Sequence, residues 1–254
     1  MSHMHVKKQM QQQLSHWQNQ RLQLALKLML QAMHLPLKQE LKLPAAMTPA
    51  AMHLQRNLQS KTVSDNGAWL VVGLGNPGPT YASTRHNIGA MVIDELVSQN
   101  SEKLTRHKRA LADVCETRIG GAQVVLVKPL SYMNESGGPV KALAKFYKVA
   151  PEQIIVLHDE LDIPLAAIRV KLGGGDNGHN GLKSIRSAMG GGDWFRVRLG
   201  IGRPPGQQDP ADFVLRNFAS TESAEVEILK TQGCEAVSAL ITKGLIETQN
   251  LYNS

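Results

Sequence analysis

The sequence predicts an α/β fold in which a largely parallel or mixed sheet is covered by helices. Two observations lead to this prediction. Short apolar runs typical of buried strands recur between residues 69 and 201, and stretches with helical spacing of apolar residues separate them. Glycine and asparagine cluster where several of the apolar runs end, as expected for loops at strand ends.

The predicted strands are short and rich in apolar, often β-branched residues. The first ends directly in glycines, and the fourth alternates between apolar and basic residues, which is typical of a strand with one exposed face. In chain order, the strands are Trp69–Leu74, Val124–Val127, Ile154–Leu157, Ile168–Leu172 and Phe195–Ile201.

The predicted helices have apolar residues three or four positions apart. The first of them shows this spacing at Ile88, Met91, Val92 and Leu96. In chain order, the helices are Asn87–Val97, Val140–Val149, Leu182–Met189, and one or two amphipathic helices within Glu222–Thr248.

The first 65 residues differ in composition from the rest of the chain. They are rich in glutamine and methionine, carry eight basic residues against two acidic ones, and contain no glycine. We therefore expect a basic extension, residues 1–65, that is poorly ordered or partly helical, followed by a globular domain, residues 66–254. A secretory signal is disfavoured, whereas a transit peptide and an upstream translation or cloning artefact both stay open.

The net charge of +7 is unevenly distributed. Most of it lies in the extension, while residues 66–204 carry 17 basic and 12 acidic residues and residues 205–254 carry 3 and 7. A basic part of the domain fits a phosphate-bearing partner that docks on one face, although scattered surface charge produces the same asymmetry.

Two features favour a cytoplasmic protein without membrane contact. The sequence has no uncharged apolar run of about 18 residues, so we expect no membrane-spanning helix. Cys115 and Cys234 are far apart and lack the spacing of a zinc site or a disulfide framework. We therefore expect two reduced core thiols.

The segment V-V-G-L-G-N-P-G, residues 71–78, satisfies the G-x-G-x-x-G pattern of dinucleotide-binding proteins. Asp94, about 20 residues further on, adds to the likeness, which makes a nicotinamide-dependent oxidoreductase one alternative function. Pro77 and Pro79 argue against it because they obstruct the helix that should follow the glycines. Asp94 also falls inside a predicted helix, not at a strand end. We therefore expect no nucleotide cofactor.

Isolated polar residues lie near the ends of the predicted strands. His86 stands in T-R-H-N-I-G, between a loop and a helix start, and the others are Asn76, Asn134, Asp159 and Asn180. A glycine-rich loop before Asn180 permits close approach of a ligand. A histidine, a carboxylate and neutral amides together supply a base, its orienting group and hydrogen-bond donors. This set suits hydrolysis of an acyl bond by an activated water.

Five motifs carry a resemblance to a known family: G-L-G-N-P-G, T-R-H-N-I-G, K-P-L-S-Y-M-N-E-S-G, H-D-E-L-D and G-H-N-G-L-K-S. In their order and spacing, the chain from about Trp69 to the C-terminus resembles the bacterial peptidyl-tRNA hydrolases. The resemblance implies a single domain with a mixed twisted sheet surrounded by helices, active as a monomer without metal or cofactor. It also implies the reaction, which is hydrolysis of the ester between a peptide and the 3′-terminal ribose of its tRNA.

The resemblance assigns roles to individual residues. His86 matches the general base that activates water, and Asp159 matches the aspartate that orients its imidazole. Asn76 matches the asparagine beside the histidine, where its amide positions water or the scissile carbonyl. Asn134 and Asn180 match asparagines that hold the peptide and the 3′ end of the RNA.

Further residues are expected to support the site. Asp162 competes with Asp159, but its place before Ile-Pro favours a structural turn. Tyr81 matches a family position near the site, and packing under the His86 loop is an equal alternative. His179 is expected to support substrate binding and not catalysis. The expected phosphate partners in the tRNA acceptor stem are Lys171, Lys183 and Arg203.

The chain departs from the family at Asp176 and Asn177, where further glycine is frequent, so the loop that faces the substrate is altered. A second function stays open, that of a non-catalytic RNA-binding relative that serves in splicing. The presence of both His86 and Asp159 argues against it, because a pure RNA-binding protein has no chemical need for this pair.

Overall fold

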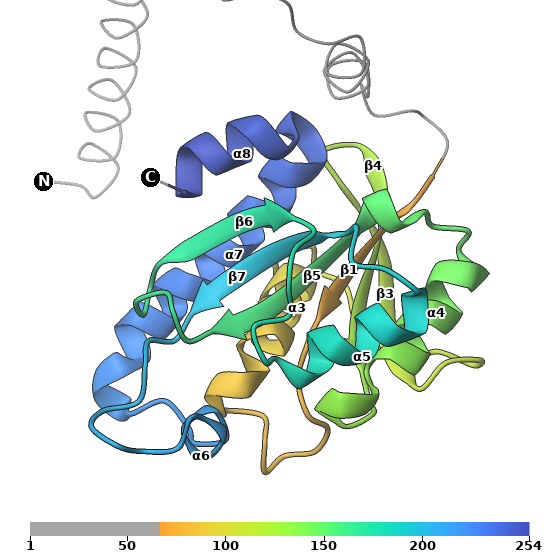
Figure 1. Cartoon of the computed structure of the whole chain (residues 1–254). Coiled ribbons are helices and arrows are strands. Elements are labelled where there is room, and N and C mark those ends of the chain that lie inside the picture. Colours follow the sequence, from red (N-terminus) through yellow and green to blue (C-terminus); the bar gives the residue numbers. More distant parts are fainter. Residues whose placement is uncertain (1–66, 254) are drawn as a thin grey trace, which may run out of the picture. The chain divides into compact units, whose positions relative to one another are not determined.

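The computed structural model describes residues 67–253 (Figure 1). The expected extension, residues 1–65, lies outside them. At the centre is a mixed seven-stranded sheet in the order β2-β3-β4-β1-β5-β7-β6. Its four inner strands β4, β1, β5 and β7 are parallel, and the outer strands β3, β2 and β6 each run antiparallel to the neighbour on their inner side. The strands are β1 (Trp69–Gly73), β2 (Thr105–Arg106), β3 (Ala112–Ile119), β4 (Ala122–Pro129), β5 (Ile154–Glu160), β6 (Ile168–Leu172) and β7 (Phe195–Gly200).

Helices cover both faces of the sheet. α4 and α5 pack together on the near face in Figure 1, and α3 and α7 pack together on the far face. The α-helices are α3 (Ile88–Gln99), α4 (Gly137–Phe146), α5 (Asn180–Met189), α6 (Pro210–Val214), α7 (Ser223–Lys243) and α8 (Leu245–Tyr252). The short 3-10 helices are η1 (Arg85–Asn87), η2 (Met133–Glu135), η3 (Pro151–Gln153) and η4 (Ser220–Glu222).

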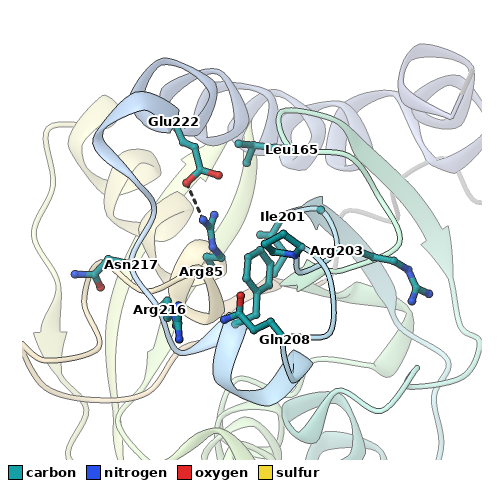
Figure 2. Close-up of a pocket in the computed structure, with 11 residues that line it drawn as sticks. Arg85, Leu165, Ile201, Arg203, Gln208, Arg216, Asn217 and Glu222 are labelled. Atoms are coloured by element: carbon teal, nitrogen blue, oxygen red, sulfur yellow. Dashed lines mark hydrogen bonds and ion pairs between the residues drawn. The ribbon is translucent and has the colours of Figure 1, made fainter.

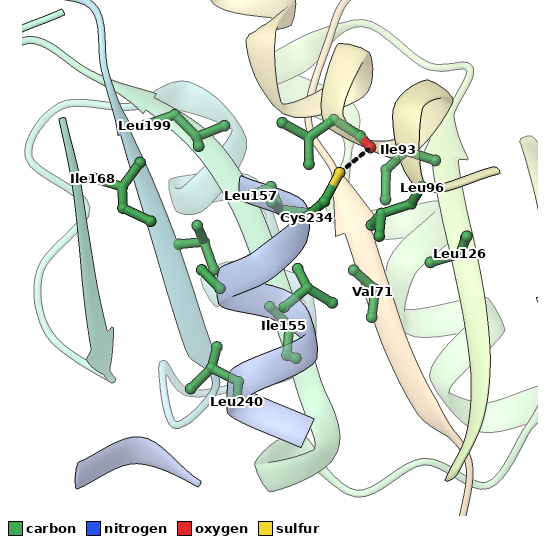
Figure 3. Close-up of a cluster of buried hydrophobic side chains, with 14 of the residues drawn as sticks. Val71, Ile93, Leu96, Leu126, Ile155, Leu157, Ile168, Leu199, Cys234 and Leu240 are labelled. Carbon is green, nitrogen blue, oxygen red and sulfur yellow. Dashed lines mark hydrogen bonds between the residues drawn. The ribbon is translucent and has the colours of Figure 1, made fainter. Parts of the chain in front are cut away.

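Alternating side chains of the inner strands form two separate cores. Val71 and Ile155 belong to the core under α3 and α7, which Figure 3 shows, whereas their neighbours Val72 and Val156 belong to the core under α4 and α5. This alternation explains why both strands are apolar throughout. Cys234 lies in the first core, and burial raises the pKa of its thiol to about 12. It is a free, buried cysteine, as the sequence predicted.

Glycines of the first two motifs allow α3 to lie against the sheet. A Cβ on Gly73 would lie 2.3 Å from the backbone oxygen of Gly89, and a Cβ on Gly89 would lie 2.3 Å from that of Leu157. Neither distance is possible for real atoms, so these positions require glycine for close backbone packing. Asp94 lies within α3 and pairs with Lys128. Close packing therefore explains Gly73 and also Gly75, where a Cβ would lie 2.9 Å from that of Ala90 in α3, whereas Gly78 has a φ of 94°, as expected in a turn.

The predicted α/β fold with a mixed sheet is confirmed, and so are all five predicted strands and the predicted helices, with ends that differ by a few residues. Three elements, β2, β3 and α6, were not predicted from the sequence. β3 was missed because it lies next to the sheet edge and carries charged residues, such as Glu116 and Arg118, between its buried ones. Among residues 67–253, no helix is long and apolar enough to cross a membrane.

Candidate active site

Four of the predicted site residues lie near the ends of β1 and β5. His86 and His179 both contact Asp159, and Asn76 is hydrogen-bonded to Asn87, the residue after His86. Asn76 follows β1, His86 lies in η1 just before α3, and Asp159 is the second-last residue of β5. His179 is the N-cap of α5. Because β1 and β5 are parallel neighbours, their carboxyl ends lie side by side, at the edge of the sheet where open α/β folds bind ligands.

Asp159 fixes the ring of His86. His86 Nδ1 lies 2.8 Å from Asp159 Oδ1, and the exposed fractions of the two side chains are 11% and 4%. An ionised carboxylate can only accept hydrogen bonds, so the Nδ1 of His86 carries the proton and its Nε2 keeps a lone pair. Among residues 67–253, His86 Nε2 has no hydrogen-bond partner. The ring is thus oriented and in the tautomer that can take up a proton at Nε2.

Asp159 is held in its ionised form. Burial raises the pKa of this carboxyl, but the adjacent His86 and His179 lower it more, so that the pKa lies well below its usual range. The preceding residue, His158, donates from Nδ1 to the Asp159 backbone oxygen at 2.7 Å. Burial, together with the nearby His179, holds the pKa of His158 well below its ordinary value. His158 is therefore neutral and steadies the backbone without adding charge.

His179 also binds Asp159, and the helix fixes its tautomer. Its Nδ1 accepts hydrogen bonds from the backbone N–H groups of Gly181 (3.1 Å) and Leu182 (3.4 Å), which caps α5. An imidazole nitrogen that accepts carries no proton, so the proton is on Nε2. Nε2 donates to Asp159 Oδ1 at 3.0 Å. A single carboxylate oxygen therefore receives hydrogen bonds from two imidazole rings whose centroids are 4.9 Å apart.

His86, Asp159 and His179 are also a possible metal-binding set, since their nearest ligand atoms lie within 4.8 Å of one another. The proton positions argue against it. Both nitrogens that face Asp159 are N–H donors, and the remaining lone pair of His179 is occupied by backbone N–H groups. The arrangement is that of a hydrogen-bonded triad, with no free nitrogen between the rings for a metal ion.

We expect the His179→Asn variant to show a kcat about tenfold lower, with KM nearly unchanged. Asparagine is a good helix N-cap, so it replaces the cap while removing the hydrogen bond to the charged Asp159, a bond worth roughly 1.5–3 kcal/mol. Steady-state kinetics and thermal unfolding measure the two effects separately. The His179→Ala variant should lose the cap as well, with about 1 kcal/mol of stability. An unchanged kcat in both variants would show that His179 only caps the helix.

Hydrogen bonds fix both the backbone and the side chain of Asn76. Its side-chain Oδ1 accepts from the backbone N–H of Met133 at 2.8 Å. The side chain of Asn87, a residue that is 4% exposed, holds the backbone of Asn76. Asn87 Oδ1 accepts a hydrogen bond from the backbone N–H of Asn76 at 2.9 Å, and Asn87 Nδ2 donates one to the backbone oxygen of Asn76 at 2.9 Å. The Nδ2 of Asn76 has no partner among the described residues. Asn76 therefore presents a fixed, free N–H₂ group. Asn87 was not predicted as a site residue, although it directly follows His86 in the same motif.

Asn134 and Asn180 present exposed amides near this group. Asn134 lies in η2 directly after Met133, and Asn180 is the first residue of α5. Neither side chain has a hydrogen-bond partner among residues 67–253, so both amides are available to a ligand. Tyr81 is half-buried, with its ring edge-on to Tyr132 at 6.5 Å between centroids. It has no direct contact with His86 among the hydrogen bonds and ring contacts of the described residues.

A second group of charges lies under the glycine-rich loop that joins β6 to α5. Arg196 is fully buried and donates to the backbone oxygens of Gly174 and Gly175, which holds the loop down. Arg198 pairs with Glu160 at 3.0 Å. Lys171 lies opposite Arg196 in the sheet, and its pKa is lowered by burial and then by Arg198 and Arg196. Arg196, Arg198 and Glu160 were not predicted as site residues, although the alternation of β7 points both arginines to the sheet face that carries Lys171.

Asp176 and Asn177, which depart from the family pattern, fix the glycine-rich loop. Asp176 Oδ1 accepts from the backbone N–H of Gly178 at 3.2 Å, and its carboxylate lies 3.8 Å from Arg186. Asn177 has a φ of 48° and donates to Glu160 Oε2 at 3.4 Å. Asparagine tolerates this left-handed conformation. The two departures add contacts that hold the loop near the end of β5.

The other predicted residues lie outside the triad. Asp162 is 47% exposed and pairs with Arg203, not with His86. The alternative of Asp162 as the orienting carboxylate therefore has no support in the geometry. Lys183 is exposed on α5 and has no ion-pair partner among residues 67–253.

Fold and site together define an α/β enzyme whose centre pairs a histidine with a buried, ionised aspartate. Residues 70–254 match the family model of peptidyl-tRNA hydrolases. A peptidyl-tRNA hydrolase of Frankia casuarinae is 58% identical over 193 residues, which are 76% of this chain and 98% of the relative. One of Streptomyces coelicolor is 54% identical over 75% of this chain and 98% of the relative. The chain belongs to the peptidyl-tRNA hydrolase family.

A solved structure agrees with this assignment. Peptidyl-tRNA hydrolase of Acinetobacter baumannii superposes with a TM-score of 0.68 and 36% identity, covering 74% of this chain and 94% of that one. The resemblance inferred from the five motifs is thereby confirmed.

Proposed function

We propose that this chain hydrolyses the ester that links a peptide to the 3′-terminal ribose of tRNA, with His86 as general base. The observation that carries the proposal is the orientation of His86: its Nδ1–H is held by a buried, ionised Asp159, and its Nε2 lone pair is free. The free N–H₂ of Asn76 supplies a donor without charge. A base and a fixed donor are what water attack on an ester needs.

The reaction proceeds in two balanced steps. A water molecule gives a proton to His86 Nε2 while its oxygen attacks the ester carbonyl carbon, and the carbonyl oxygen becomes an oxyanion that accepts from Asn76 Nδ2. The tetrahedral species then collapses and the bond to the ribose oxygen breaks. That oxygen takes the proton from His86 Nε2. The products are an intact RNA 3′-hydroxyl and a peptide carboxylic acid, which releases its remaining proton to solvent and becomes a carboxylate. Asp159 stabilises the imidazolium formed between the two steps.

On the substrate side, Asn134 and Asn180 bind the peptide and the RNA 3′ end through their exposed amides, and Tyr81 borders this region. Lys171 binds phosphates of the acceptor stem, because it lies on the cationic sheet face that also carries Arg196 and Arg198. Lys183 and Arg203 have weaker support as phosphate partners. Lys183 lies on α5 and not on the sheet face that carries Lys171, and Arg203 pairs with Asp162. His179 acts as a positioning residue through Asp159.

The Lys171→Ala variant is expected to raise KM for peptidyl-tRNA several-fold with kcat unchanged. Loss of one phosphate contact should also lower by about 1 the slope of log KM against log salt concentration. Steady-state kinetics at several salt concentrations measure both quantities. Lys243→Ala removes an exposed lysine at the end of α7, on the far face, and serves as the matched control. Equal salt slopes for the two variants would contradict the assignment.

The function is tested by incubating the full chain with N-acetylated, labelled aminoacyl-tRNA and following release of the acyl group. Turnover supports the proposal, whereas binding of the RNA without release would replace it with the RNA-binding alternative. We also propose that the protein acts as a monomer in the cytoplasm, without metal or cofactor. Residues 66–254 would form the hydrolase domain, and residues 1–65 would be an extension.

A further inference from the structure

A cavity separate from the triad lies between the end of β7, α6 and the segment that precedes η4 (Figure 2). Its volume is about 430 Å³. Asn76, His86, Asp159 and His179 do not line it. Three arginines line it instead, namely Arg85, Arg203 and Arg216, with apolar surface from Leu165, Ile201 and Phe213.

Arg85 is a buried cation whose hydrogen-bonding capacity is only partly used. The residue is 7% exposed, and its guanidinium lies 4.5 Å from the ring centroid of Phe213 and 4.7 Å from that of Phe218. Nη2 donates to Glu222 at 2.7 Å. Nε and Nη1 are buried and have no partner among the described residues. Buried donors without partners are costly, and native structures keep few of them.

The remaining polar groups of the cavity favour an acceptor-rich ligand. The Nε2 of Gln208 is a third buried donor without a partner among residues 67–253. Arg216 is exposed at the cavity, and its guanidinium has no partner in the described part of the chain. The carboxylate of Glu222 is already bound by Arg85 and by the backbone N–H of Ala219. All three unpartnered buried groups are thus donors, and the lining carries a net positive charge.

We infer that this cavity binds a phosphate-bearing ligand of about mononucleotide size. Guanidinium groups suit phosphate oxygens, which accept several hydrogen bonds and carry negative charge. The volume lies in the range of small-molecule sites, about 300–1,000 Å³, and exceeds that of a phosphate ion alone. Ile201, Leu165 and Phe213 offer apolar surface for the base or sugar.

Two sources share this chemistry, a free nucleotide and a nucleotide unit of RNA. Arg85 and His86 are neighbours in η1, so a ligand that contacts Arg85 contacts the residue next to the proposed catalytic histidine. The RNA source rests on the proposed function, and the free nucleotide does not.

Calorimetric titration of the full chain with 5′-AMP, and separately with inorganic phosphate, tests the site without any catalytic step. Arg216→Gln removes an exposed guanidinium whose loss disturbs no described contact. Arg118→Gln is the control: it removes an exposed guanidinium near the end of β3, which within residues 67–253 donates only to the backbone oxygen of Gly121. We expect 5′-AMP to bind the wild type and Arg118→Gln equally, and Arg216→Gln at least tenfold more weakly. No binding of 5′-AMP, or equal binding by all three proteins, would overturn the inference.

The KM for peptidyl-tRNA then distinguishes the two sources. A KM that rises in Arg216→Gln together with the Kd for 5′-AMP identifies the site as one for a nucleotide of the RNA. A weaker 5′-AMP affinity with an unchanged KM identifies a site for free nucleotides. The titration measures binding and does not depend on turnover. It therefore tests the cavity even if the chain fails to hydrolyse peptidyl-tRNA.

Discussion

The His86→Ala variant is expected to lose nearly all hydrolysis of N-acetylated aminoacyl-tRNA, with kcat falling about 10³-fold, within the range for loss of a general base. KM should change little, because no group assigned to RNA binding is removed. The fall corresponds to about 4 kcal/mol of transition-state stabilisation. Single-turnover release of the labelled acyl group measures it.

His107→Ala is the matched control for this variant. The ring of His107 packs on Phe146, 4.9 Å between centroids, and the residue directly follows β2, the outermost strand on the far side of the sheet from β6. Its loss should leave kcat within about twofold of the wild type, since it removes no group near the reacting atoms. If His86→Ala kept more than a tenth of the wild-type kcat, His86 would not be the base.

The Asp159→Asn variant should show a kcat about 10² to 10³-fold lower, although its side chain has the same shape. The amide cannot stabilise the imidazolium with a negative charge, and its N–H₂ favours the wrong tautomer of His86. Asp162→Asn is the matched control, because that carboxylate pairs with Arg203 outside the triad. It should retain nearly full activity. Equal losses in the two variants would contradict the role of Asp159.

The same variant changes the dependence of stability on pH. The pKa of Asp159 is lower in the folded chain than its usual value, so its ionisation stabilises the fold at pH values above about 3.9, the unfolded value. This contribution disappears as the pH falls through the folded pKa. The melting temperature of the wild type should therefore fall more steeply than that of Asp159→Asn as the pH is lowered below about 4. Parallel curves would show that Asp159 is not stabilised as an anion.

The sequence allowed the strands and the members of the site to be predicted, but not the site's geometry. Asn76, His86 and Asp159 stand in recognisable motifs, yet 73 positions separate the histidine from the aspartate. Their contact depends on β1 and β5 being parallel neighbours, which periodicity does not specify. The tautomer of His179 depends on the direction of backbone N–H groups at the start of α5. No pattern of residue types reports that direction.

The basic residues around the triad were harder to predict from the sequence than the triad itself. Lys171 was identified by its match to the family, whereas Arg196 and Arg198 were read only as part of a strand. Arg85 stands in the same motif as His86, but its two unpartnered donors become visible only when Phe213, Phe218 and Glu222 are placed around it. Those residues lie more than a hundred positions away in the sequence.

Hydrolysis of N-acetylated aminoacyl-tRNA in ¹⁸O-labelled water tests the central claim most directly. Attack of a water activated by His86 on the ester carbonyl puts one ¹⁸O atom into the released acyl carboxylate and none into the RNA. Mass spectrometry of both products reads the position of the label. Label in the carboxylate, with an unlabelled and intact 3′-hydroxyl, is the predicted result. Label at the RNA end, or no release by the full chain, would contradict the claim.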